Sequence, residues 1–326
     1  MTERRWVACA ALVVLLAAGG LTACGSDETQ AQPSAVPAGE ATATTTVPTG
    51  TAQAAPVSRV PRATVNRFNG KGAFALLREQ VQEYGWRPAG SPALRRLAVR
   101  LRSLMPRGRF EAIPGHPGLR NVVGSVPGRM PAIVVGAHYD VEAAPRGFVG
   151  ANDGAAGTAA VVTLARAFAR APRPRNARAI RFVLFDGEEE PAGCEPFIQC
   201  GLRGSTAYAE RHAAKTRALV LLDYIAEREG LRFIREQGSD PALWAQLRRA
   251  ASAVGVGSLF AGGTSGEIID DHTPFTQRGV RAIDLIDFDY PQRDSLADDL
   301  DAVSERSLDA VGEAVYRLTA QLRTRG

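Results

Sequence analysis

Lysine is nearly absent from this chain of 326 residues and occurs only at Lys71 and Lys215. The 39 lysine and arginine residues are therefore almost all arginine, scattered along the chain among 34 acidic residues. The net charge is +5 and the pI is near 9.3. A nucleic-acid-binding protein gathers its basic residues in one tract or on one face. Because these arginines are dispersed, we expect no nucleic-acid partner.

Long apolar runs are also scarce, and the one near the N-terminus is too short to span a membrane. Arg4 and Arg5 precede an apolar stretch from Val7 to Leu21, and Leu21-Thr-Ala-Cys24 closes it. This three-part form is typical of a signal peptide, here residues 1–23. Its ending is similar to the bacterial lipoprotein box, in which the cysteine is lipidated and becomes the mature N-terminus. We expect an exported protein, either anchored to the cell membrane by lipid on Cys24 or extracellular after a plain secretory signal.

Cysteine is sparse as well. Besides Cys9 and Cys24, the chain contains only Cys194 and Cys200. In an oxidising compartment, a close pair with Pro and Gly nearby favours a small disulfide loop. The alternative is a pair of free thiols in a metal site, but no His or second Cys pair lies close by in the sequence. The pair therefore predicts a disulfide.

Large apolar residues are almost missing from residues 25–60, which are rich in Ala, Thr, Pro, Gly, Ser and Gln. Such a segment cannot bury enough surface to order itself. We interpret residues 24–62 as a disordered tether and residues 63–326 as one catalytic domain. The sequence shows no internal repeat.

The rest of the chain alternates between strand and helix patterns. The patterns predict helices at 72–84, 91–105, 154–170, 203–213, 240–253 and 305–323, and strands at 120–126, 131–137, 178–185, 218–223 and 281–287. Apolar strands alternating with helices indicate an α/β fold, a single-domain three-layer α/β/α sandwich around a mostly parallel mixed sheet. Gly128 and Pro131 suggest a hairpin after strand 120–126, and hence an antiparallel edge. The Gly-rich span 255–272 predicts a loop over the site.

Potential metal ligands follow the ends of several predicted strands. His138 follows Ile133–Ala137, Glu188 and Glu189 follow Ile180–Phe185, and Asp223 follows Leu219–Leu222, while Asp153 lies in a Gly-rich turn before a helix. In open α/β sheets, ligands bind outside the carboxyl ends of the strands. His, Asp and Glu are the ligands of catalytic zinc. The pattern predicts a zinc site in which one of the paired glutamates binds metal and the other takes a proton.

Each of these signals also has a structural interpretation. Asp153 could be a helix N-cap, Glu188 and Glu189 could be an acidic first helical turn, and Asp223 could be satisfied by backbone amides. Two further groups could support the site. Asp140, two residues after His138, could help to fix the imidazole. In Asp270-Asp271-His272, His272 could bind substrate, orient a carboxylate or ligate metal, and Asp271 could be a cap.

Taken together and in this order, the segments resemble the family of secreted zinc aminopeptidases that also contains the animal glutaminyl cyclases. The resemblance runs from about Tyr84 to Leu322. It rests on Arg87-Pro-Ala-Gly-Ser91, Gly136-Ala-His-Tyr-Asp140, Gly150-Ala-Asn-Asp-Gly-Ala-Ala-Gly157, Phe185-Asp-Gly-Glu-Glu189, Gly201-Leu-Arg-Gly-Ser205, Leu221-Leu-Asp223 and Asp271-His-Thr-Pro-Phe275. The resemblance implies that His138 and Asp223 hold one zinc, that Asp153 bridges, that Glu189 holds a second zinc, and that Glu188 is the general base.

The chain departs from the family at one position. Family members carry a second metal-ligand His after a Tyr-Pro or Phe-Pro pair. Here the segment from Tyr290-Pro291 to Val303-Ser304 aligns Asp294 with that His. The four histidines are His116, His138, His212 and His272, so none replaces it nearby. Aspartate can ligate zinc but reaches less far from the backbone. The sequence therefore predicts two zinc ions if Asp294 is a ligand and one otherwise.

Three functions are consistent with these residues. The leading interpretation is a zinc aminopeptidase that hydrolyses peptides with a free N-terminus and meets the membrane only through its N-terminal lipid. The second is a glutaminyl cyclase, which needs one zinc and Glu188 as proton shuttle; Asp270-Asp271-His272 with Pro274-Phe275 resembles that branch. The third is a non-catalytic binding module on the same fold, which the Asp294 departure would favour.

Overall fold

The computed structural model describes residues 59–194 and 196–324. The predicted signal peptide, the lipidation site Cys24 and most of the predicted tether lie outside these residues. Val60, at the end of that tether, is buried in the core, so the packed region reaches back at least this far. Within the described part of the chain, none of the helices combines the length and the hydropathy that a membrane span requires.

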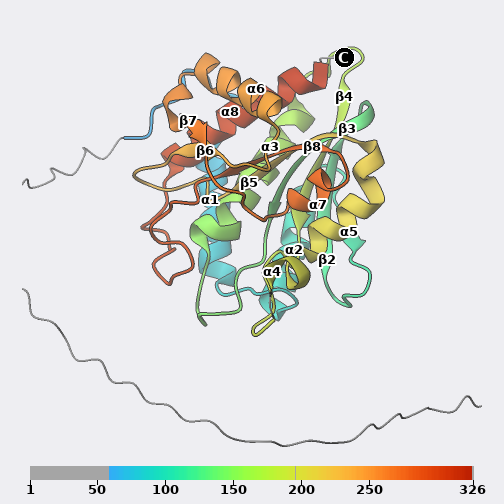
Figure 1. Ribbon diagram of the computed structural model, residues 1–326, viewed down its shortest axis with the longest axis vertical. Helices are drawn as coiled ribbons and strands as arrows, with labels where there is room; N and C mark the ends of the chain where they lie inside the picture. The colour runs from blue at the N-terminus through green and yellow to red at the C-terminus, as the bar shows by residue number, and fades with distance from the viewer. Residues whose placement is uncertain (1–58, 195, 325–326) are drawn as a thin grey trace, which may run out of the picture. The chain divides into compact units, whose positions relative to one another are not determined.

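A six-stranded sheet forms the centre of this region (Figure 1). Its strands, in spatial order, are β1 (Arg109–Ala112), β2 (Arg120–Val126), β4 (Arg178–Phe185), β3 (Arg129–His138), β5 (Thr216–Asp223) and β8 (Arg281–Ile286). The pairs β4–β3, β3–β5 and β5–β8 are parallel, whereas β2 runs antiparallel to both β1 and β4. The sheet is therefore mostly parallel and mixed, as the sequence predicts, with an antiparallel edge.

The predicted hairpin between β2 and β3 is wrong, because β4 lies between these two strands. The seven residues Ala132–His138 of β3 are buried, so β3 needs a partner strand on each side and packs in the sheet interior. The sequence prediction also missed the edge strand β1 and a separate two-stranded sheet of β6 (Phe233–Arg235) and β7 (Phe260–Thr264). Because β7 lies within 255–272, only part of that span is the predicted loop.

Helices cover both faces of the sheet, which confirms the three-layer fold (Figure 1). Alternate strand residues point to opposite faces. Val135, Phe182 and Val220 contribute to the larger hydrophobic cluster, and Val134, Val183 and Leu219 to the smaller one. The larger cluster includes α1 (Gly70–Glu79), α2 (Pro92–Leu104), α3 (Gly157–Arg170), α6 (Pro241–Ala253) and α8 (Glu305–Thr324). The smaller cluster includes α5 (Arg203–His212) and α7 (Thr273–Thr276).

Local sequence sets where several helices begin. Ser91 accepts a hydrogen bond from the backbone N–H of Leu94 at 3.1 Å, and Asp240 accepts one from Leu243 at 2.6 Å. Each of these N-caps is followed by proline at the first helical position, where its missing N–H costs nothing. The remaining short elements are π-helical turns at Gln80–Tyr84 and Ala151–Ala156, the one-turn helix α4 (Phe197–Cys200), and 3₁₀ turns at Ala213–Lys215 and Gly257–Leu259.

The parallel register brings the predicted ligands to one edge of the sheet. His138 pairs with Phe185 of β4, and Gly136 pairs with Leu221 of β5. Two residues further along, His138 and Asp223 therefore end neighbouring strands at the same level. Helix α3 packs closely over this end, because a Cβ at Gly157 would lie 2.3 Å from the carbonyl oxygen of Leu222. The absence of a side chain at Gly157 thus sets the distance between α3 and β5.

We predict that Gly157→Ala destabilises the fold by about 1–3 kcal/mol, because the added methyl must push α3 away from β5. Gly262→Ala is the matched control, since a Cβ at Gly262 meets no atom within 4 Å. Urea unfolding of the two variants measures the difference. Equal stability of both would show that α3 shifts without cost.

Candidate metal centre and active site

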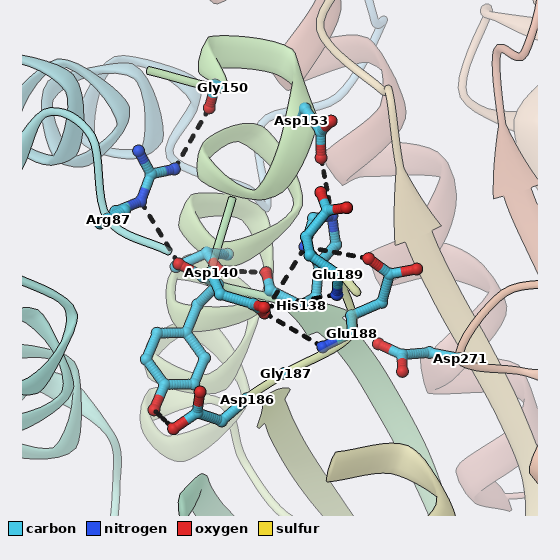
Figure 2. Close-up of polar contacts among 12 residues, drawn as sticks. Arg87, His138, Asp140, Gly150, Asp153, Asp186, Gly187, Glu188, Glu189 and Asp271 are labelled. Atoms are coloured by element: carbon cyan, nitrogen blue, oxygen red, sulfur yellow. Dashed lines mark hydrogen bonds and ion pairs between the residues drawn. The ribbon is translucent and has the colours of Figure 1, made fainter. Parts of the chain in front are cut away.

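His138, the last residue of β3, is the centre of the site (Figure 2). Its imidazole is buried, and Nε2 lies 3.1 Å from Asp153 Oδ1 and 3.3 Å from Asp223 Oδ1. The other ring nitrogen, Nδ1, lies 3.8 Å from Glu188 Oε2 and 3.9 Å from Asp140 Oδ1. The predicted ligands from three separate segments therefore converge on the two nitrogens of one imidazole.

Asp153 lies in the π-helical turn that precedes α3, with a non-helical backbone (φ −82°, ψ 106°). Gly150 and Gly154 on either side have φ of +51° and +81°, which favour glycine. The Asp153 carboxylate faces His138 and accepts a hydrogen bond from Tyr224 Oη at 2.8 Å. Helix α3 itself has no side-chain N-cap hydrogen bond. Asp153 thus points into the site and does not cap the helix.

Glu188 and Glu189 lie in the turn after β4, held by a carboxylate from the neighbouring strand. Asp140 accepts hydrogen bonds from the backbone N–H groups of both glutamates, each at 3.3 Å (Figure 2). Arg203, at the start of α5, donates to the carbonyl oxygens of Gly187 and Glu189. Asp140 therefore positions the glutamate turn as well as facing the imidazole.

Burial and crowding favour the protonated forms of these acids when no cation is bound. Burial, together with Asp270 and Asp271, raises the pKa of Glu188 well above its usual range, although His138 opposes this shift. Burial also raises the pKa of Glu189, with added repulsion from Asp153 and Glu188. Like charges packed in a low-dielectric site cannot all ionise unless a positive charge joins them.

Two supporting residues were not assigned a role from the sequence. Asp298 is buried and accepts hydrogen bonds from the backbone N–H groups of Asn152 and Asp153, at 2.9 and 3.0 Å. Arg87 is buried too, and it donates to the carbonyl oxygens of Tyr139 and Gly150 (Figure 2). Both hold the backbone around the metal ligands. The sequence offered only weak signals for them, because Arg87 belongs to a motif that resembles the family and Asp298 is one of several acids after Tyr290.

Asp294 does not join the metal ligands. Its side chain is 49% exposed and forms an ion pair with Arg293 at 3.2 Å. Asp294 Oδ1 lies 3.2 Å from Tyr224 Oη, which links it to Asp153 only indirectly. Among the described residues, the ligand groups that come within 4.8 Å of one another at this site are His138, Asp153 and Asp223, and His138, Glu188 and Glu189. The position that carries a ligand His in the family therefore lies at the rim here.

The residues of Asp271-His272 face different neighbours. The carboxyl group of Asp271 is directed toward Glu188 (Figure 2), and burial and Asp270 raise its pKa. His272 faces two other acids, with Nε2 3.5 Å from Glu236 Oε1 and Nδ1 3.8 Å from Asp284 Oδ2. Of Asp271 and His272, which the sequence predicts to support the catalytic centre together with Asp140, only Asp271 faces it.

A pocket of about 300 Å³ opens onto the cluster. Its wall combines apolar residues such as Phe197, Ile268 and Phe288 with the acids Glu142 and Glu190. Burial, Asp153 and Asp294 raise the pKa of Glu142 to about 7. One wall is fixed by the predicted disulfide, since the structure joins Cys194 to Cys200. The pocket offers an apolar surface with a surplus of carboxylates around it.

The donor set fits a zinc ion. His138, Asp153 and Asp223 supply one imidazole nitrogen and two carboxylates, a combination found at catalytic zinc. All three are buried, and among the described residues none forms an ion pair with Lys or Arg. Asp140 faces the other imidazole nitrogen, as carboxylates do in many zinc sites. Glu188 and Glu189, on the far side of the imidazole, complete an acidic wall.

The profile of Peptidase family M28 matches residues 121–319. The chain belongs to this family. The match covers more than half of the chain and includes every residue of the metal cluster. Membership of this zinc-dependent family supports an enzyme with an exopeptidase-like fold.

The individual proteins similar to this chain include an aminopeptidase, a glutaminyl cyclase and an exopeptidase. The aminopeptidase YwaD of Bacillus subtilis (strain 168) is 28% identical over 200 residues, which cover 56% of this chain and 39% of that protein. The chain thus spans only about two fifths of this relative. The glutaminyl cyclase of an Acidobacteriales bacterium is 27% identical, with a TM-score of 0.70, over 84% of this chain and 100% of that structure. A Zn-dependent exopeptidase from Parabacteroides distasonis ATCC 8503 shares the fold at 22% identity, with a TM-score of 0.69, over 80% of this chain and 100% of that structure.

We predict that Asp294→His increases the zinc bound per chain by one ion, because it restores a ligand type with longer reach in the pocket that Asp153 and Glu189 also line. Asp294→Ala is the control and should leave the zinc content of the unaltered chain unchanged. Metal analysis after zinc loading and dialysis measures both. A loss of zinc in Asp294→Ala would show instead that Asp294 is already a ligand.

We predict that the metal-free protein loses stability as pH rises from about 4 to about 7. Burial and Asp140 raise the pKa of Asp186 to about 7, and burial and Asp153 raise that of Asp298 to about 7. The folded state therefore holds protons that the unfolded chain releases near pH 4, and this advantage disappears as pH passes 7.

Between about pH 4 and about pH 7, Asp186→Asn should reduce the loss of unfolding free energy by about 2–4 kcal/mol. The exposed control Asp301→Asn should leave this loss unchanged. Unfolding in chelator at several pH values provides the measurement. Stability that rises between pH 5 and pH 7 would contradict the prediction.

Proposed function

We propose that this chain is a zinc enzyme that acts on the N-terminal residue of peptides, with one catalytic zinc, and that it converts N-terminal glutamine to pyroglutamate. The observation that carries this proposal is the position of Asp294. The set of His138, Asp153 and Asp223 is assembled, and the other set at this site, His138, Glu188 and Glu189, shares its imidazole. Asp294, which would complete an independent second set, forms an ion pair with Arg293 at the rim. A two-metal hydrolytic site needs a second complete set, but cyclisation requires only one metal.

Similarity to solved structures supports the same reaction. The 27% identity to the Acidobacteriales cyclase extends over that whole structure, and the cyclase of Porphyromonas gingivalis is 25% identical over its full length. The exopeptidase structure, at 22% identity, supports the fold alone. The cyclase comparison therefore covers the complete catalytic domain.

In this reaction the substrate's α-amine attacks its own γ-carbonyl carbon. A C–N bond forms to close the ring, the bond to the amide nitrogen breaks, and ammonia leaves. A zinc ion held by His138, Asp153 and Asp223 would supply a Lewis acid for the γ-carbonyl. Because attack is intramolecular, holding the side chain in a folded-back conformation provides much of the rate.

Glu188 is suited to move the proton. It lines the pocket, and its backbone is fixed by Asp140. As a carboxylate it accepts the proton that the attacking amine loses, and it then donates this proton to the departing ammonia. Asp271 faces Glu188 from the buried side (Figure 2), so the two acids repel one another when both are ionised. This repulsion makes Glu188 a stronger base toward the amine.

The pocket is consistent with a peptide N-terminus. Glu190 and Asp294 add negative charge to its lining, which attracts the ammonium group of an approaching peptide. Phe197, Ile268 and Phe288 provide an apolar wall against the methylene groups of the first side chain. The substrate class is therefore a peptide or protein with a free N-terminal residue.

Hydrolysis of the first peptide bond is the second candidate. The sequence similarity to aminopeptidase YwaD favours it, as does membership of a peptidase family. In that case Glu188 would take a proton from water and pass it to the leaving amine. The two reactions have different products, because the peptidase releases a free amino acid and the cyclase releases ammonia.

We predict that the zinc-loaded chain releases ammonia from a peptide with N-terminal glutamine and that Glu188→Gln slows this release by about 100- to 10,000-fold. The zinc content should stay unchanged, because Glu188 is not one of the three ligands. Glu229→Gln, on an exposed loop, is the control. Mass spectrometry of the peptide and an ammonia assay measure the products.

Release of free glutamine would show that the chain is an aminopeptidase and would overturn the proposal of cyclisation. No change in the peptide with either the unaltered chain or Glu188→Gln would overturn both catalytic proposals.

A further inference from the structure

A second group of potential ligands lies behind the catalytic cluster. Asp270, His272 and Asp284 place one ligand atom each within 4.8 Å of one another. Their exposed fractions are 4%, 1% and 0%. None of them belongs to the set formed by His138, Asp153 and Asp223. The group is therefore a separate, fully buried combination of one imidazole and two carboxylates.

Several polar atoms of this group have no hydrogen-bond partner. They are Asp270 Oδ2, His272 Nδ1, and both carboxylate oxygens of Asp284. Among the described residues, neither carboxylate forms an ion pair with Lys or Arg. A buried polar group without a partner costs about 1–3 kcal/mol, and a charged group costs more. These atoms need either protons or a cation between them.

The orientation of His272 favours a cation. Its Nε2 faces Glu236 Oε1 at 3.5 Å, and Glu236 is itself held by the backbone N–H of Gly238 at 2.6 Å. The tautomer with the proton on Nε2, facing Glu236, leaves the lone pair of Nδ1 facing Asp284 Oδ2. Metal-ligating histidines commonly have this arrangement, with a carboxylate on the second nitrogen.

The spacing of the facing atoms also fits ligands of one ion. His272 Nδ1 lies 3.8 Å from Asp284 Oδ2, which is too long for a direct hydrogen bond. Two ligands of a tetrahedral zinc ion, at bond lengths of roughly 2.0–2.2 Å, lie about 3.4 Å apart. A small inward shift of either side chain would bring both atoms to a shared ion.

The group borders the active-site pocket through one of its members. Asp270 lines that pocket, whereas His272 and Asp284 are not among its lining residues. Asp284 pairs with Leu221 in the β5–β8 register, two residues before the level of Asp223.

We propose that Asp270, His272 and Asp284 bind a second divalent cation of the zinc type, with Glu236 orienting His272. An imidazole with two carboxylates suits zinc better than calcium or magnesium, which prefer oxygen ligands alone. The ion would join the segment before α7 to strand β8. That segment also carries Ile268 and Ile269, which form part of the pocket wall. The ion is thus a structural support for the wall and is distinct from the catalytic zinc.

The test is zinc binding by the full chain and by Asp284→Asn, which keeps the shape of the side chain but removes its charge. We expect Asp284→Asn to bind one zinc ion fewer per chain than the unaltered protein. The same decrease should occur in a His138→Ala background, where the catalytic set is already incomplete. Asp301→Asn, an exposed aspartate, is the matched control and should bind as much zinc as the unaltered chain.

A second measurement does not depend on the variants. Zinc should raise the melting temperature of the His138→Ala protein, and Asp284→Asn or His272→Gln should abolish this increase. Anomalous diffraction from zinc-soaked crystals of the unaltered chain should place an ion between the three side chains. Unchanged zinc content in a folded Asp284→Asn protein, together with no anomalous peak there, would overturn the proposal and leave a protonated carboxyl pair.

Discussion

Repulsion among buried carboxylates is the constraint on which the rest of this site depends. Asp140, Asp153, Glu188, Glu189 and Asp223 lie around one imidazole at the carboxyl edge of the sheet. Bringing these acids together is costly without positive charge. The surrounding structure reduces the cost in two ways. Backbone N–H groups and the buried guanidinium of Arg87 offset part of the repulsion, and the geometry leaves room for a divalent cation to offset the rest.

Strand order explains how segments far apart in the sequence reach one place. Each ligand lies at the end of a parallel strand, in the turn that follows one, or in the turn before α3, so the register of β4, β3 and β5 fixes their relative positions. The outer parts of the site come from irregular segments. The rim residue Asp294 has a φ of +56° and belongs to a turn after Tyr290. Local hydrogen bonds fix the position of this turn, and the strand register does not.

These differences explain what could be predicted from the sequence. Apolar runs predicted that His138, Glu188, Glu189 and Asp223 lie together, because parallel strands place their ends at one edge of a sheet. The structure brings these side chains together, with Asp153 from its Gly-rich turn beside them. The predicted β2–β3 hairpin was wrong because local turn residues do not reveal that β4 lies between these two strands. The surroundings of His272 could not be predicted from the sequence either, because its neighbours Glu236 and Asp284 come from distant segments that no motif connects.

The disulfide between Cys194 and Cys200 holds one wall of the pocket in place. The loop that it closes carries Phe197, which forms part of the pocket wall. The chain then leads into Gly201 and Leu202, where the N–H of Leu202 donates to the carbonyl oxygen of Glu188. In a reducing compartment the cross-link would open, and the wall beside Glu188 would lose its tether. The entrance of the pocket is therefore expected to be best formed where this disulfide persists.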